Sequence, residues 1–282
     1  MKKTKIKFLT ILMVLVLAFS LGACGGSDAP KDASSDESSG APVEKTDDSA
    51  SNEDNNADNN ADSNSESGND SNDSSDSSQT ETAGGKAKEL KTSETGKIEV
   101  LESGYSYEGE DGLTAGVILG NANSKKAFEY PGVRVTAYGD DGSVLGTTEG
   151  SCEMILPGEK AAFSVNIDTK GKKPKKVEVK ADQGDEASDT QGAFKAKDVP
   201  VTNVTENVDK EYDEISFTGE VENKTKEDLS MPYLITILRN KGKIVYAYEE
   251  MLDDIPKGGK LPFDFSFYSK VKHDKYEFYM VK

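Results

Sequence analysis

The sequence predicts an all-β fold built from two tandem β-sandwiches that follow a long N-terminal segment of different character. Three observations carry this prediction. Beyond about residue 95, short runs of alternating apolar and polar residues follow one another, turns rich in Gly and Pro separate them, and several segments recur at a period near 100 residues. No sustained apolar stripe with a 3.6-residue period occurs there, so we expect strands rather than helices.

The first 23 residues have the three-part pattern of a bacterial secretory signal peptide. The first seven residues include four lysines, a mostly apolar run occupies residues 8–19, and small residues close it. The apolar run is too short to span a bilayer. We therefore expect residues 1–23 to be a signal peptide.

The four residues Leu21-Gly22-Ala23-Cys24 resemble the lipobox of bacterial lipoproteins. The resemblance implies that Cys24 receives a thioether-linked diacylglycerol and becomes the first residue after cleavage. A thiolate is the soft nucleophile that such a lipid transfer needs, and two acyl chains anchor stably because each buried CH₂ contributes about 0.8 kcal/mol. We expect a lipoprotein on the extracytoplasmic face of the cell membrane. The alternatives are a plain secreted protein and an uncleaved N-terminal anchor.

Residues 24–92 form an acidic linker after the cysteine. Residues 25–83 contain sixteen Asp or Glu against two Lys, a net charge of about −14 out of −18 for the whole chain. Such a composition buries too little apolar surface to offset its ordering entropy, so disorder is expected. A flexible chain of this length spans roughly 40 to 50 Å, which makes it a spacer. Binding of cations, or repulsion of anionic envelope polymers, is the alternative role for its charge.

Three alternating runs, at residues 133–138, 161–167 and 175–179, predict strands in the first part of the folded region. Between them lie the turns "GDDGS" and "LPGE". Gly supplies a positive φ in such turns, and Pro presets φ at the first corner.

An internal repeat organises the rest of the chain. "LGNANSKK" from Leu119 aligns with "VENKTKED" from Val221, and "DGSVLG" from Asp141 aligns with "KGKIVY" from Lys241. "ILPGEKAAFSV" likewise aligns with "DIPKGGKLPFDF". Two copies of about ninety residues, with about seven short strands each, match the size of an immunoglobulin-like β-sandwich.

The repeat predicts a first sandwich over residues 93–182, a hinge over residues 183–193 and a second sandwich over residues 194–282. The polar, Gly-containing stretch "DQGDEASDTQ" places the hinge. Asn121 and Asn223 each end a strand, where a short amide can bond back to its own backbone and close a turn.

The pattern of these copies resembles the FxLYD-type module of extracytoplasmic bacterial lipoproteins. The pattern is a strand ending in [LV]-x-N, an alternating strand, a G-x-[VI]-[LV] hairpin and L-P-G-E-x-x-x-F. At the signature position the first copy has Ala-Tyr-Gly-Asp from Ala137, and the second has Ile-Leu-Arg-Asn from Ile237. The resemblance implies a small β-sandwich outside the cytoplasm, and it transfers no catalytic residue.

Residues for catalysis are scarce. His273 is the only histidine, which disfavours a Ser-His-Asp arrangement or a His-rich metal site. Its neighbours predict an exposed turn. Cys152 has no partner for a disulfide if Cys24 is lipidated, so it is expected to be a small buried hydrophobe.

No cofactor or metal is expected. The acidic stretches "GEDG" and "GDDGS" lack the spaced pattern of a calcium loop, and turn chemistry explains them. No Gly-rich phosphate loop is present, and an isoelectric point near 4.6 disfavours nucleic acid as a partner.

Four aromatic residues are the candidates for a binding surface. Tyr105 and Tyr107 lie on one face of an expected strand, and Phe128 and Tyr130 lie in or beside a loop. Amphipathic rings at loop ends suit contacts with proteins or glycans. The alternative is that these rings belong to the core or its edge.

The sequence thus predicts a monomeric, lipid-anchored envelope protein that is not an enzyme and presents two sandwiches to an unknown envelope protein or glycan. An accessory or substrate-capture lipoprotein that works with a membrane transporter is the alternative. A hydrolase that uses His273 with Asp274 is a third class.

Overall fold

The computed structural model describes residues 80–82 and 84–282, all within one compact unit, residues 70–282. Strands dominate this part of the chain, and its only helices are two short 3₁₀ turns, η1 at Gly109–Asp111 and η2 at Ala196–Asp198. The prediction of an all-β fold is confirmed. The predicted signal peptide, Cys24 and the linker up to residue 79 lie outside the described residues.

The N-terminal sandwich consists of two main sheets and one small sheet. Its first sheet has the order β2-β3-β8, with β2 at Ile98–Tyr107, β3 at Leu113–Asn121 and β8 at Lys160–Ile167. Its second sheet has the order β1-β9-β5-β6, with β1 at Thr80–Thr82, β9 at Lys176–Asp182, β5 at Gly132–Tyr138 and β6 at Val144–Ser151. The small sheet joins β10 at Asp185–Glu186, β4 at Phe128–Glu129 and β7 at Met154–Ile155. The three strands predicted from alternation are thus β5, β8 and β9.

The C-terminal sandwich repeats this arrangement with fewer strands. One sheet has the order β11-β12-β15, with β11 at Val201–Asp209, β12 at Glu214–Glu222 and β15 at Lys260–Tyr268. The other has the order β14-β13-β16, with β13 at Tyr233–Asn240, β14 at Lys243–Met251 and β16 at Lys275–Val281. The sheets share a core rich in aromatic rings, in which Phe217 contacts Phe265, Phe267, Tyr276 and Phe278. Six strands form here, where about seven were expected.

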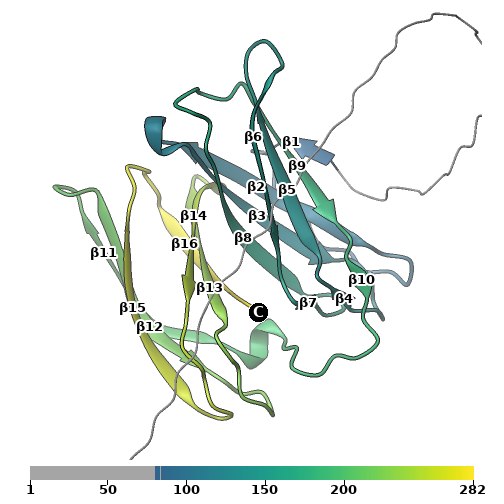
Figure 1. Ribbon diagram of the computed structural model, residues 1–282. Coiled ribbons are helices and arrows are strands. Elements are labelled where there is room, and N and C mark those ends of the chain that lie inside the picture. The colour runs from purple at the N-terminus through teal and green to yellow at the C-terminus, as the bar shows by residue number, and fades with distance from the viewer. Residues whose placement is uncertain (1–79, 83) are drawn as a thin grey trace, which may run out of the picture. The chain divides into compact units, whose positions relative to one another are not determined.

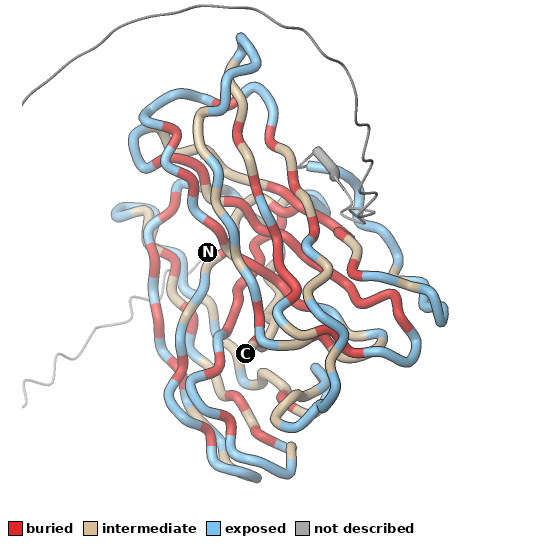
Figure 2. Tube along the Cα trace, turned by 45° about the vertical axis from the view of Figure 1, so that its right-hand side comes forward, coloured by how far each residue is buried: buried red, intermediate tan, exposed pale blue. Residues whose placement is uncertain are grey.

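The two sandwiches pack through the sheets that face each other, β2-β3-β8 and β14-β13-β16 (Figure 1). Ile235, Ile237, Ile244 and Ala247 belong to the C-terminal sandwich by sequence, yet they pack in the buried core cluster of the N-terminal one. The four sheets therefore form successive layers. Figure 2 shows long buried runs in the interior of the molecule. Every residue of β3 except Thr114 is buried.

The inner strands show in their sequence that they are buried on both faces. β3 reads LTAGVILGN and β13 reads YLITILRN, which are nearly continuous apolar runs rather than alternating ones. The two sandwiches can approach each other closely because two residues without side chains, Gly104 on β2 and Gly116 on β3, lie directly opposite each other in the sheet. A Cβ atom on Gly104 would lie 2.1 Å from the carbonyl oxygen of Ile244 on β14.

The segment predicted as a hinge, residues 183–193, lies partly along the N-terminal sandwich. β10 pairs with β4, and the Gln183 Oε1 accepts a hydrogen bond from the Ile98 backbone N–H at 3.1 Å. Gly184 has φ of 64°, and a Cβ there would lie 2.1 Å from the Glu129 carbonyl oxygen, so this close turn requires glycine.

The end of the predicted linker is also part of the fold, which corrects the boundary placed at residue 92. β1 pairs with β9, and the backbone N–H groups of Gly84 and Lys88 donate to the carbonyls of Ser103 and Leu101, each at 2.8 Å. Leu90 packs against the core. One apolar side chain and a set of backbone hydrogen bonds hold residues 84–92 against the N-terminal sandwich, although their composition is typical of a linker.

Asn121 and Asn223 close equivalent turns at the ends of β3 and β12. The Asn121 Nδ2 donates to the carbonyls of Lys126 and Ile155 at 2.8 and 2.9 Å, and its Oδ1 accepts from the Asn123 N–H at 2.9 Å. The Asn223 Nδ2 donates to the carbonyls of Glu227 and Ile255, each at 2.9 Å, and its Oδ1 accepts from the Thr225 N–H at 2.9 Å. The predicted role is confirmed: both amides are buried, and each also ties its turn to the segment that leads into the neighbouring strand of the same sheet, β8 or β15.

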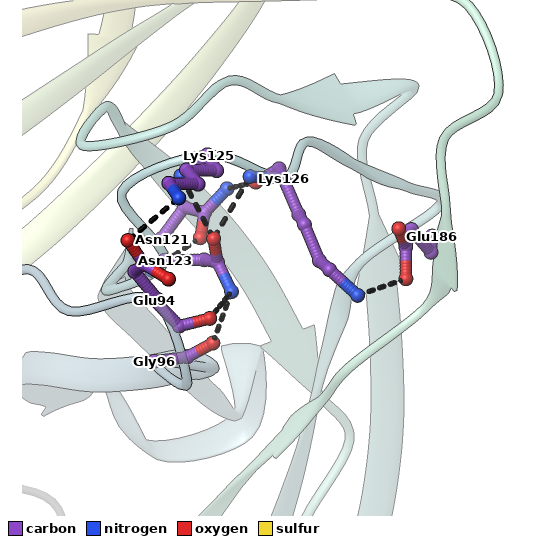
Figure 3. A network of polar contacts seen from close by, with 7 residues as sticks. All are labelled: Glu94, Gly96, Asn121, Asn123, Lys125, Lys126 and Glu186. Carbon is purple, nitrogen blue, oxygen red and sulfur yellow. Dashed lines mark hydrogen bonds and ion pairs between the residues drawn. The ribbon is translucent and has the colours of Figure 1, made fainter.

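Asn123 adds a further tie in the N-terminal sandwich (Figure 3). Its Nδ2 donates to the carbonyls of Glu94 and Gly96, each at 3.0 Å, while its Oδ1 accepts from the N–H groups of Lys125 and Lys126, each at 2.8 Å. The chain that enters β2 is thereby held against the turn after β3.

Candidate binding groove

A groove of about 590 Å³ lies where the N-terminal sandwich, residues 191–201 and the C-terminal sandwich meet. One wall comes from β7 and the following turn, another from residues 191–201 and β11, and the third from β16. We name it the β16 groove. Its apolar lining includes Met154, Leu156, Phe194, Val201, Phe278 and Met280.

The groove opens at the edge of both sheets of the C-terminal sandwich. β16 is the last strand of its sheet, and β11 is the last strand of the other. The side chains of Tyr276, Phe278 and Met280 pack against the core of this sandwich, but they are only partly buried. The core is thus accessible from the groove along this edge.

Most of the charged groups that line the groove already have partners within the protein. The Lys282 Nζ lies 3.2 Å from Glu153 Oε2, and the Glu159 Oε2 accepts a hydrogen bond from the Ala196 N–H at 3.2 Å. Glu277 pairs with Lys275 at 3.0 Å and with Arg239 at 3.1 Å. The groove therefore offers a ligand somewhat more apolar than polar surface, and few charges without partners.

Two ionisable side chains in the lining have shifted pKa values. Burial disfavours the charged form of Glu277, but its hydrogen bonds to Arg239 and Lys275 outweigh burial and hold its pKa below the usual range. Burial, with the nearby Glu277 charge, raises the pKa of Tyr279 to about 12. At neutral pH the groove therefore presents an ionised but paired carboxylate and a neutral phenol.

The predicted surface residues Tyr105 and Tyr107 lie on β2 and are partly buried. Tyr105 packs against the core of the N-terminal sandwich. The Tyr107 hydroxyl donates to the Gly171 carbonyl at 2.6 Å. Both rings thus have contacts within the N-terminal sandwich.

Phe128 is a core residue, with 8% of its surface exposed, which corrects its assignment to a binding surface. Its position on β4, paired with Ile155 of β7, turns the ring inward. Tyr130, two residues later, is 65% exposed and has φ of 51°. It lines a second recess, beside Cys152 and Glu249. The structure therefore does not bring the four candidate rings together on one surface.

His273 lies between β15 and β16, and its side chain is only 7% exposed, so the exposed turn predicted for it is wrong. Its Nε2 lies 2.5 Å from Glu206 Oε1, and the neighbouring Asp274 accepts a hydrogen bond from the Lys241 N–H. Cys152 is free and buried, as predicted, and burial raises the pKa of its thiol to about 12. A thiol with such a pKa is not a nucleophile at neutral pH.

Within residues 84–282, no group of three or more His, Cys, Asp or Glu side chains is arranged to hold a metal ion. The turn "GDDGS" is closed by Asp141, whose Oδ1 accepts hydrogen bonds from the N–H and hydroxyl of Ser143. No helix in the described part of the chain is long and apolar enough to cross a membrane.

The groove residues were missed in the sequence because they come from three separate segments. One signal was present: β16 reads KYEFYMV, with Tyr276, Phe278 and Met280 on one face. The same alternation is typical of any core-facing strand, so it does not reveal that the face lies beside an open edge.

No protein-family model matches this chain, and no curated protein is similar enough to count as a relative. The resemblance to FxLYD-type modules and to the lipobox therefore stays a prediction from the sequence.

Proposed function

We propose that this chain is a lipid-anchored extracytoplasmic protein that is not an enzyme and that holds a partner protein in the β16 groove. The anchor rests on the sequence motif at Cys24 and on the acidic linker that follows it. The linker would keep the folded part at a distance from the membrane while leaving it free to find partners.

The observation that carries the binding role is the groove itself. It has a volume of about 590 Å³, its lining exposes somewhat more apolar than polar surface, and the side chains of Tyr276, Phe278 and Met280 are left partly exposed there. Concave apolar surface that remains open to water marks sites of interaction. The partly exposed aromatic and aliphatic side chains favour a protein over a glycan, because a protein can bury apolar side chains against them, whereas sugar hydroxyls that lose water need polar partners.

A second candidate is a substrate-capture protein that serves a membrane transporter. The same volume supports it, since sites for small molecules typically measure about 300 to 1,000 Å³. A small ligand would raise the melting temperature of the isolated chain, because it binds only the folded state. A partner that binds only in its assembled, envelope-bound form would not do so.

The test is cross-linking in intact cells that express the full chain, followed by purification from the membrane fraction. Leu156→Asp places a charge in the groove wall, and Tyr268→Asp makes the matched change on β15 at a residue that is 69% exposed. We expect a cross-linked partner that is reduced at least about tenfold by Leu156→Asp and retained by Tyr268→Asp. Equal yields from both variants would refute binding in the groove.

The same preparation tests the anchor. Cys24→Ser removes the thiol that the lipid would modify, so we expect the variant to leave the membrane fraction. Full retention of the variant in that fraction would contradict lipid anchoring at Cys24.

A further inference from the structure

The edge strands β9 and β16 occupy equivalent positions in the two sandwiches. β5 pairs with both β6 and β9, and β13 pairs with both β14 and β16. Each central strand has a bulge near its end, after Ala137 in β5 and after Leu238 in β13. Ala137 lies opposite Val177 of β9, and Leu238 lies opposite Tyr276 of β16.

This register makes Val177, Val179 and Ala181 the counterparts of Tyr276, Phe278 and Met280. The first three are essentially buried, at 1%, 0% and 2% exposure. The last three are only partly buried, although they also face a sandwich core. The two edges thus differ in how completely they are covered.

An added strand covers the first edge. β1 pairs antiparallel with β9, with Glu81 opposite Val179. By the register above, a strand in the same place on the C-terminal sandwich would lie opposite Phe278. Among the described residues no strand pairs with that edge of β16. The Lys282 carbonyl, directly after β16, accepts a hydrogen bond from the Glu153 N–H, so the free part of the edge is the part opposite Phe278, which falls on the β16 groove.

The segment that precedes the C-terminal sandwich does not fill this position, because it is held in the groove rim. The Lys224 N–H donates to the Asp198 carbonyl at 2.8 Å, and the Glu222 N–H donates to the Pro200 carbonyl at 3.1 Å. The Ala196 N–H donates to Glu159 of the N-terminal sandwich. In the N-terminal sandwich, by contrast, the preceding segment supplies β1.

We propose that β16 accepts an extended segment of the partner protein as an additional antiparallel strand, whose alternate apolar side chains enter the β16 groove. This inference rests on the proposed function and specifies how the partner binds. Backbone hydrogen bonds to the open edge would supply affinity, and the apolar lining would select the side chains. The paired charges of the groove favour a segment with uncharged residues at the inward positions.

The experiment uses the full chain and two synthetic peptides. The first is an acetylated peptide, Lys-Thr-Val-Thr-Val-Thr-Val-Lys amide, and the second has the same sequence with N-methyl groups on its three valines. The two peptides have matched apolar side chains, but N-methylation removes backbone donors. The Leu156→Asp and Tyr268→Asp variants serve as groove and control variants, and amide hydrogen exchange reports on β16.

We expect the first peptide to bind, to slow hydrogen exchange within residues 277–281, and to bind at least about tenfold more tightly than the methylated peptide. Binding should be lost in Leu156→Asp and kept in Tyr268→Asp. Equal affinity of both peptides, binding without protection of β16, or no binding at all would overturn strand addition. A dimer that forms with rising protein concentration and protects β16 would also overturn it, since the occupant would then be a second copy.

These outcomes separate the two proposals. If the cellular partner depends on Leu156 but neither peptide protects β16, the groove binds a protein in another way, and only the inference of strand addition fails. If the cellular partner is unaffected by Leu156→Asp, the proposed function itself fails, whatever the peptides do.

Discussion

Replacing Gly104 with valine is expected to lower the free energy of unfolding by about 3 kcal/mol, because it forces the two sandwiches apart. A Cβ at Gly104 would lie 2.1 Å from the Ile244 carbonyl oxygen and 2.8 Å from its carbonyl carbon. These are backbone atoms of β14 and cannot turn aside as a side chain could. Overpacking of this kind usually costs about 1 to 3 kcal/mol, and the gap here is at the severe end. Urea denaturation followed by circular dichroism measures the loss.

Two further variants test whether the loss comes from the close contact at Gly104 rather than from adding a valine to any strand. Gly116→Val places the same side chain on the paired strand, where its Cβ would lie 2.8 Å from Ile244 Cγ2 and 3.0 Å from Ala247 Cβ. A smaller loss is expected there, since these contacts are longer than the 2.1 Å contact at Gly104. Ser266→Val adds the same group on an exposed position of β15 and should change stability little. Unchanged stability of Gly104→Val would mean that the sandwiches do not pack closely in solution.

Replacing Arg239 with methionine is expected to cost about 3 to 5 kcal/mol of stability, the range for breaking a buried ion pair. Arg239 lies on β13, and its Nη1 donates to Glu102 Oε1 of β2 at 2.6 Å, across the contact between the sandwiches. The two side chains are 10% and 4% exposed. The variant would leave the Glu102 carboxylate buried without its partner. Equilibrium denaturation at pH 7 gives the loss.

A double variant tests that cause. Arg239→Met combined with Glu102→Leu removes both charges, so it should be more stable than Arg239→Met alone. A double variant no more stable than the single one would indicate that lost packing, and not the uncompensated charge, causes the effect.

The dependence of stability on pH tests the role of Arg239 independently, through its ion pair with Glu277. The pKa of Glu277 is depressed in the folded protein, so this carboxylate contributes stability that is present above its unfolded pKa, about 4.5, and is lost as the pH falls through its lower folded value. The difference in stability between the parent protein and Arg239→Met should therefore narrow at acidic pH.

Features that depend on local chemistry were predictable from the sequence. The strands now seen as β5, β8 and β9 alternate clearly, and Asn121 and Asn223 close the turns that their short amides suit. Such patterns operate over a few residues, so neither needs knowledge of a distant segment.

Features that depend on distant segments were not predicted. The near-continuous apolar runs of β3 and β13 are a signal that both faces are buried, but the sequence alone does not say which surface covers them. Phe128 was assigned to a surface because a strand of only two residues gives no alternation by which to judge its face. The positions of residues 80–82 and 84–92 likewise depend on contacts with β2 and β9.

The sequence by itself determined the all-β class, the main strands and the paired asparagine turns, because periodicity and turn chemistry act along the chain. Only the tertiary structure decided that two sandwiches stack through Gly104 and Gly116, that Arg239 meets Glu102, and that β16 lies uncovered beside a groove. The physical reason is that each of these depends on which surfaces fit closely enough to exclude water. Arg239 and Glu102, for example, lie 137 positions apart in the chain, and no local sequence pattern predicts that they meet.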